Sequence, residues 1–264
     1  MIYEAGARIP FNEYLELPCI SSHGLMLIER SPFHYKASID APRPPSAKQE
    51  LGTLTHLAIL EPDEYARRVS IAPDIDRRSK AGKQEYESYL ASLPKDAITA
   101  SIEQEIAIKK MRDSVMTQPY AAALLANGVA ETTVIATISS IVVKGRPDWL
   151  PHDLPIIVDL KTAVDASPRG FSRAAANFNY HLQAALYVDL LTEVTGQEHE
   201  FVFLVVENEP PYCVALYQLT FDAIEKGRRR YKNALRIYKQ CLETGEWPGY
   251  AIEVTEIELP RWAA

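Results

Sequence analysis

The stretch IIVDLKTA, residues 156–163, places two charged side chains inside an apolar run that favours a β-strand. Residues at positions i and i+2 of a strand project from the same face, so Asp159 and Lys161 point the same way. Burying one charge without a partner is costly, so the pair serves either the structure or a reaction. From these two residues alone, a structural ion pair and an active site are equally good interpretations.

A second aspartate, Asp148 in the phrase GRPDW, lies eleven residues before Asp159. If segments 140–149 and 156–161 pair as a hairpin, the two carboxylates come together. Neighbouring carboxylates repel each other, and a divalent cation relieves this repulsion. Oxygen ligands favour hard cations, so we expect Mg²⁺, with Mn²⁺ as a substitute. Beside such a metal, Lys161 would hold or help to deprotonate an attacking water and neutralise developing charge, which is the chemistry of phosphodiester hydrolysis.

The remaining segments predict the elements that must position these residues. In the first half we expect helices at 22–31 (ending before Pro32), in two stretches over 47–69 (the second opened by Pro62), at 79–92, and at 101–117. Ser101 and Gln104 have capping-box spacing at the start of the last of these helices. The Pro-rich segment APRPPSA, 41–47, should be extended.

The character of the sequence changes at residue 131. The β-branched segment 131–143 indicates one strand, which would form a hairpin with the segment after it, and 200–207 and 212–220 indicate two strands separated by a Pro-Pro turn. Helices are expected at 167–194, broken or kinked around NFNY, and at 221–244. This order predicts an α/β fold with a mixed sheet flanked by helices.

Composition limits the possible classes of protein. The 264 residues are 47% hydrophobic and 24% charged, as in an ordinary globular chain, and we expect a single domain over 1–264 with a mainly helical part (1–130) and a sheet core (131–264). There is no run of 18 apolar residues and no signal-peptide pattern, so we expect a cytoplasmic protein without a membrane span. The chain has three cysteines, which are widely spaced, so we expect neither a zinc ribbon nor a disulfide framework. The net charge of −7 does not by itself suggest a nucleic-acid partner.

GRPDW followed by DLK resembles the signature of the PD-(D/E)xK nucleases. Further blocks resemble the exonuclease VIII (RecE-type) branch of phage and prophage recombination exonucleases, over roughly residues 22–207: SPFHYKA, GTLTHLAILEPDEY, RRSKAGKQEYE, RPDWLP with IIVDLKTAVDASPRGF, and YHLQAALYVD. The resemblance implies a 5′-to-3′ exonuclease that acts on linear duplex DNA and leaves 3′ overhangs for an annealing protein. It also implies a homotetrameric ring, in a bacterial cell or a phage-infected host.

The same resemblance assigns roles to individual residues. Asp148 and Asp159 would bind the metal, together with the backbone carbonyl of Leu160 and the side chain of His56, and Lys161 would be the catalytic lysine. Gln183 and Tyr187 match a Q-x-x-x-Y element. They lie four residues apart on one helix face, from which they would orient the lysine, the carboxylates or a phosphate. Glu131 is a weaker candidate for the same site, because a glutamate at a strand end is usually solvated.

DNA contacts should come from local clusters of basic residues, which bind phosphates without reading sequence. The candidates are Arg77, Arg78, Lys80, Lys83, Arg146 and Arg173, with Lys144 and Arg169 comparable to them. For the basic run 226–232 a solvated helix face is the favoured interpretation. Two other functions stay open at this point: an endonuclease with the same catalytic residues, and a DNA-end-binding module without activity.

Overall fold

The structure is a computed structural model that describes residues 9–41 and 46–259. Most of the segment expected to be extended, 41–47, lies outside these residues. The N-terminal half is mainly helical, and its helices are α1 (Phe11–Glu16), α2 (Ser22–Arg30), α3 (Pro32–Asp40), α4 (Ala47–Leu60), α5 (Pro62–Arg68), α6 (Lys80–Ser92), α7 (Ile102–Thr117) and α8 (Pro119–Leu125). Two short strands, β1 (Val69–Ile71) and β2 (Ile98–Ala100), pair in parallel on either side of α6.

The C-terminal half carries the sheet and three long helices. Its elements are β3 (Gly128–Ala130), β4 (Val134–Ile138), β5 (Ile141–Gly145), β6 (Trp149–Pro151), β7 (Ile156–Ala163), α9 (Pro168–Asn177), α10 (Tyr180–Thr195), β8 (Glu200–Glu207), β9 (Val214–Tyr217) and α11 (Phe221–Thr244). The main sheet has the order β3-β6-β7-β8-β9, with β7 and β8 parallel and the other pairs antiparallel. The predicted mixed sheet flanked by helices is therefore confirmed.

Most of the helices and strands expected from the sequence are present, and two predictions need correction. The capping box of Ser101 and Gln104 opens α7 as expected. Pro32 does end α2, but it also begins α3, because Ser31 caps the new helix and proline suits its first turn. Segment 131–143 is not one strand: it contains β4, a turn at Ser139 and Ser140, which both have positive φ, and the start of β5, and the two strands form a hairpin that extends to Gly145.

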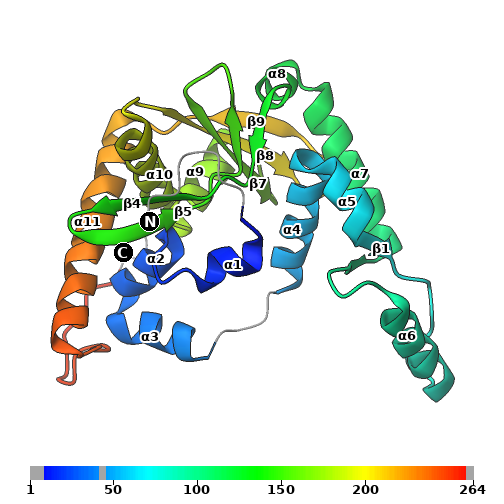
Figure 1. Cartoon of the computed structure of the whole chain (residues 1–264), viewed down its shortest axis with the longest axis horizontal. Helices are drawn as coiled ribbons and strands as arrows, with labels where there is room; N and C mark the ends of the chain where they lie inside the picture. The colour runs from blue at the N-terminus through cyan, green and yellow to red at the C-terminus, as the bar shows by residue number, and fades with distance from the viewer. Residues whose placement is uncertain (1–8, 42–45, 260–264) are drawn as a thin grey trace.

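The sheet lies between two groups of helices (Figure 1). Along β7, Ile157 belongs to a core cluster shared with α2, α10 and α11, whereas Val158 and Leu160 belong to a second cluster shared with α4 and α7. Because strand residues alternate between faces, Asp159 and Lys161 project toward the α10 side together with Ile157. No helix in the described ranges is long and apolar enough to cross a membrane.

Candidate active site

Asp159 and Lys161 form an ion pair on the α10 face of β7. The Nζ atom of Lys161 lies 2.5 Å from Oδ2 of Asp159. The Asp159 carboxylate is completely buried and the Lys161 side chain is 17% exposed. A charge pair at the centre of a sheet must gain enough from its partners to offset the loss of hydration, so the surroundings of the pair decide what it can do.

Asp148 reaches this pair from the neighbouring strand. It directly precedes β6, which is antiparallel to β7 and pairs with it at Trp149 and Val158. The backbone N–H of Leu160 donates to Oδ2 of Asp148 at 2.8 Å. The hairpin with β7 is formed by β6, and it brings the two carboxylates together as expected. The rest of the segment expected to pair with β7 includes β5, which pairs with β4 instead.

Two further side chains close the site from the α4 side. Nδ1 of His56, on α4, lies 3.7 Å from Oδ2 of Asp148. Glu131 follows β3, and its backbone N–H donates to the carbonyl of Asp148 at 3.0 Å. One ligand atom each from His56, Glu131 and Asp148 can be chosen so that all three lie within 4.8 Å of one another. Of the predicted metal ligands, the structure therefore groups His56 and Asp148, and it adds Glu131.

Helix α10 covers the site from the opposite side of the strand. Nε2 of Gln183 donates to Oδ1 of Asp159 at 3.1 Å, which orients that carboxylate. The ring of Tyr180 lies 5.0 Å from the Lys161 ammonium. Tyr187 is buried one turn further along and contacts Gln183 and the backbone of Arg146. Gly145 permits this approach, because a Cβ atom there would lie 2.8 Å from Leu190 and 3.0 Å from the Tyr187 ring.

The charges of these groups are strongly coupled. Burial raises the pKa of Asp148 well above its usual value, and the Asp159 charge raises it further. Burial alone would lower the pKa of Lys161, but the charges of Asp159 and Asp148 outweigh burial and raise it. Burial lowers the pKa of His56, although the Glu131 charge opposes the shift. A neutral imidazole is the form that binds metals.

The residues present fit a divalent cation. Asp159 is fully buried, and in the described structure Lys161 lies 2.5 Å from its Oδ2 atom while Gln183 donates to its Oδ1 atom. Asp148, Glu131 and His56 offer oxygen and nitrogen ligands that lie close together, and Asp159 is not among this group. The backbone of Leu160 contacts His56, so the predicted carbonyl ligand lies beside the same group of side chains. A hard cation would relieve the repulsion between Asp148 and Asp159.

Two basic residues near Asp148 in sequence do not face solvent, which corrects their prediction as DNA contacts. The side chain of Arg146 is 10% exposed, and its guanidinium bonds Oε2 of Glu131 at 2.7 Å and the carbonyl of Ile9 at 2.9 Å. Lys144 is buried, and its ammonium donates to three carbonyls around the end of α1: those of Tyr14, Leu15 and Leu17. Lys144 in β5 and Arg146 just after it are two residues apart, so both side chains point to the same, interior side of the chain. Their charges stabilise contacts within the fold.

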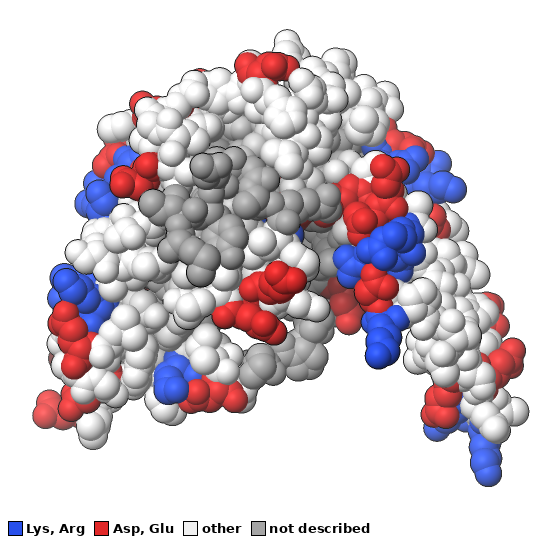
Figure 2. All heavy atoms as spheres, viewed as in Figure 1, with Lys and Arg blue, Asp and Glu red and all other residues white. Residues whose placement is uncertain are grey.

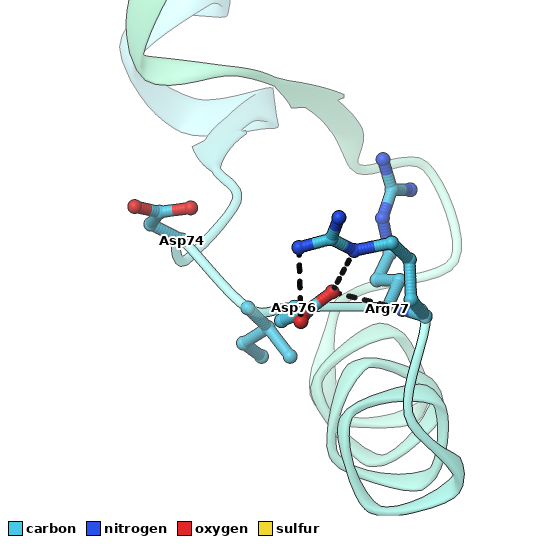
Figure 3. Close-up of a pocket in the computed structure, with 5 residues that line it drawn as sticks. Asp74, Asp76 and Arg77 are labelled. Atoms are coloured by element: carbon cyan, nitrogen blue, oxygen red, sulfur yellow. Dashed lines mark hydrogen bonds and ion pairs between the residues drawn. The ribbon is translucent and has the colours of Figure 1, made fainter.

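The basic stretch 77–83 includes the N-terminal end of α6, on an arm (residues 72–97) that projects from the rest of the molecule (Figure 1). Arg77 lies over the Tyr86 ring at 4.7 Å, and Arg78 pairs with Asp76 at 2.9 Å in an open pocket that Asp74 also lines (Figure 3). Lys80 and Lys83 are exposed. The arm carries five basic and five acidic residues, so it is not a basic surface. Its predicted DNA contacts stay predictions, and in Figure 1 helix α6 lies away from β7.

The face seen in Figure 2 likewise mixes basic and acidic side chains, without one continuous basic area. Arg169 and Arg173 are exposed on α9, on the chain between β7 and α10. In the run 226–232, a solvated helix face describes only some of the side chains. Arg228 pairs with Asp189 at 2.7 Å, and Arg230 pairs with Glu29 at 2.8 Å.

Sequence reasoning gave too little weight to two residues of the site. Glu131 has no motif around it, because the antiparallel register of β3 with β6 is what carries it to Asp148. Tyr180 did leave a signal in the sequence. It lies three residues before Gln183 and seven before Tyr187, which is the spacing of a single helix face.

Comparisons with known proteins agree with this architecture. The structure is similar to the crystal structure of a candidate exonuclease from Eubacterium rectale, with a TM-score of 0.67 and 11% identity over 97% of each chain, a likeness that shows a shared fold. A phage-related exonuclease from Haemophilus somnus 129PT is more distant, with a TM-score of 0.38 and 12% identity over 86% of this chain and 96% of that one. No curated protein matches the sequence. The sequence profile of the PDDEXK-like domain of unknown function (DUF3799) matches residues 21–259, and the chain therefore belongs to this family.

Proposed function

We propose that this protein is a metal-dependent nuclease that digests linear duplex DNA from its 5′ ends and leaves 3′ overhangs. The observation that carries the proposal is the meeting of Asp148, Asp159 and Lys161 at the junction of β6 and β7. Two buried carboxylates with one lysine and a neighbouring histidine form a set that suits phosphodiester hydrolysis. The direction of digestion and the form of the product follow from the resemblance to recombination exonucleases.

Each residue has a distinct part in this proposal. Asp148, Asp159, Glu131 and His56, with the Leu160 carbonyl, would hold Mg²⁺ or Mn²⁺. When bound, the cation supplies Lewis acidity toward a phosphate oxygen and lowers the pKa of a coordinated water.

The other side chains act on the substrate or on their neighbours. Lys161 places a positive charge where the phosphate develops negative charge in the transition state. Gln183 holds the Asp159 carboxylate in one orientation through its 3.1 Å hydrogen bond, and buried Tyr187 supports Gln183 from the next turn of α10.

The assembly and partners belong to the same proposal. A homotetrameric ring would enclose duplex DNA, and a single-strand annealing protein would take up the 3′ overhang. Exposed basic residues on the arm and on α9 (Arg77, Arg78, Lys80, Lys83, Arg169 and Arg173) are proposed to contact phosphates. Sedimentation of the purified chain, alone and with a short duplex, measures the number of subunits.

The decisive experiment compares linear and covalently closed duplex DNA, each with and without Mg²⁺, with the 5′ ends of the linear DNA labelled. We expect Mg²⁺-dependent loss of the 5′ label from linear DNA only, leaving long single strands. Cleavage of the closed circle would instead make the protein an endonuclease with the same site. If folded protein cleaves neither substrate with Mg²⁺ or Mn²⁺, the proposal of a nuclease is wrong.

A further inference from the structure

An aromatic side chain is exposed beside the candidate active site. Phe178 follows α9 directly, and its side chain is 62% exposed. Its ring stacks on the ring of Tyr180, with centroids 5.7 Å apart and planes inclined by 28°. Tyr180 is the residue whose ring lies 5.0 Å from the Lys161 ammonium. Two contacts therefore connect an exposed aromatic face to the catalytic lysine.

The row of rings is anchored in the core. Tyr180 also packs against Phe203, at 5.8 Å, and Phe171, at 6.0 Å, and both of these residues are buried. Aromatic side chains have few rotatable bonds, so a row of this kind is rigid and loses little entropy when a ligand stacks on its end. Phe178 is the solvent end of a row that begins inside the sheet.

The backbone next to Phe178 is also fixed. Asn179 has a positive φ of 57°, which places the break between α9 and α10 at this position. The Arg230 guanidinium bonds Oδ1 of Asn179 at 2.7 Å and Nε2 of His181 at 2.9 Å, and Glu29 holds the same guanidinium at 2.8 Å. At Gly227, one turn before Arg230, a Cβ atom would lie 2.0 Å from the carbonyl of His181, so α11 is pressed against this segment.

The chemistry around the ring selects a class of ligand. Arg169 and Arg173 are exposed on α9, the helix that ends just before Phe178, and the Lys161 ammonium lies 5.0 Å from the Tyr180 ring, so the elements around this exposed ring carry positive charge. A ligand that combines a flat aromatic ring with negative charge matches this arrangement, and a nucleotide of a DNA strand has both.

We propose that Phe178 is a stacking platform for a nucleobase of the strand whose phosphate lies at Lys161. The inference rests on the proposed nuclease function and names a contact that determines how the strand end is held. Stacking of one base on an aromatic side chain is worth enough to change binding or rate about tenfold or more. Because any base has a π face, the contact is independent of sequence.

The test pairs a change in the protein with a change in the DNA. Single-turnover digestion is measured on a short duplex in which an abasic residue replaces each of the first few nucleotides in turn, on either strand. The variants are Phe178→Leu, which keeps apolar bulk without a π face, and Phe178→Trp, which keeps the π face. The matched control is Phe33→Leu, because Phe33 is 60% exposed on α3, away from β7 in Figure 1.

We expect the wild-type enzyme to lose about tenfold in rate at one abasic position. Phe178→Leu should be slow on intact DNA and insensitive to that abasic position, whereas Phe178→Trp and Phe33→Leu should behave as wild type. Two results would overturn the inference: a wild-type enzyme that is indifferent to every abasic position, or a Phe178→Leu enzyme that remains as sensitive as wild type. Thermal unfolding of each variant separates these effects from misfolding.

A binding measurement keeps this inference distinct from the proposed function. With Ca²⁺ in place of Mg²⁺, 2-aminopurine is placed at the same positions and its fluorescence is followed as protein is added. Quenching by wild type but not by Phe178→Leu supports stacking, even if the protein cleaves no DNA. Binding without any difference between the two proteins, or no binding at all, overturns the inference.

Discussion

Removal of the Lys161 charge is the perturbation with the most definite consequence. Asp159 is fully buried, and in the described structure Lys161 is the cation that pairs with it, at 2.5 Å. Lys161→Met keeps most of the side-chain volume but leaves a buried carboxylate beside Asp148, with only the Gln183 amide to stabilise it. The variant should therefore lose both stability and catalytic activity.

The size of the stability effect follows from burial. Removing one partner of a buried ion pair costs about 3–5 kcal/mol. Because the Lys161 side chain is 17% exposed and solvent screens part of its charge, we expect the lower end, about 3 kcal/mol. In a chain of this size each kcal/mol lowers Tm by about 2 °C or somewhat more, so Tm should fall by about 6 °C.

The assay is thermal unfolding in EDTA at pH 8. Lys36→Met is the matched control, because Lys36 makes a 2.8 Å ion pair with Asp40 that is exposed on both sides, and such pairs contribute about 0.5 kcal/mol or less. The double variant Asp159→Asn with Lys161→Met removes both charges and should recover most of the lost stability.

Two outcomes would refute this reasoning. If Lys161→Met and Lys36→Met unfold at the same temperature in EDTA, the Lys161 charge does not stabilise Asp159. If Lys161→Met cleaves DNA as fast as wild type, the lysine has no part in the reaction, because loss of transition-state charge stabilisation should slow cleavage about 10²-fold or more.

Three further predictions concern neighbouring groups. Because the pKa of Asp148 is raised in the folded protein, the stability that this carboxyl contributes is present below the ordinary carboxyl pKa and is lost as pH rises through the folded pKa. In EDTA, Asp148→Asn should therefore be more stable than wild type at pH 8 but not at pH 4. The same variant should lose Mn²⁺ binding, and unchanged binding by calorimetry would remove Asp148 from the metal site. Gln183→Leu deletes a partly buried hydrogen bond to a charged acceptor, so it should lower stability by about 1.5–3 kcal/mol in urea unfolding and slow cleavage about tenfold. Arg146→Met leaves Glu131 unpaired and should lower Tm without changing how DNA affinity depends on salt, whereas loss of a phosphate contact would make that salt dependence shallower.

Local signals in the sequence located the elements of the site well. The β-branched, apolar run of β7 and the alternation of its side chains place Asp159 and Lys161 on one face in any register. Helix α7 begins at its capping box, and α5 begins at Pro62. These features depend on neighbours within a few residues, so they are already present in the sequence.

Pairing between distant segments could not be obtained in this way. Segment 131–143 turns back on itself because Ser139 and Ser140 adopt left-handed conformations. Glycine and asparagine are the residues that usually mark such a turn in a sequence, and these two positions hold neither. Lys144 and Arg146 looked like exposed cations beside Asp148, but their partners are carbonyls near α1 and the carboxylate of Glu131. A side chain's charge is read from the sequence, whereas its exposure depends on what packs over it.

The sequence by itself thus determined the chemical groups available to this protein: two aspartates, a lysine, a histidine and a Q-x-x-x-Y helix face. The tertiary structure decided which of them meet. It brought Glu131 to His56 and Asp148 through the β3–β6 register, and it set Tyr180 and Phe178 in a row beside Lys161 through the break at Asn179. The physical reason is that contacts between residues far apart in the chain depend on strand register and helix packing, which the whole core fixes together.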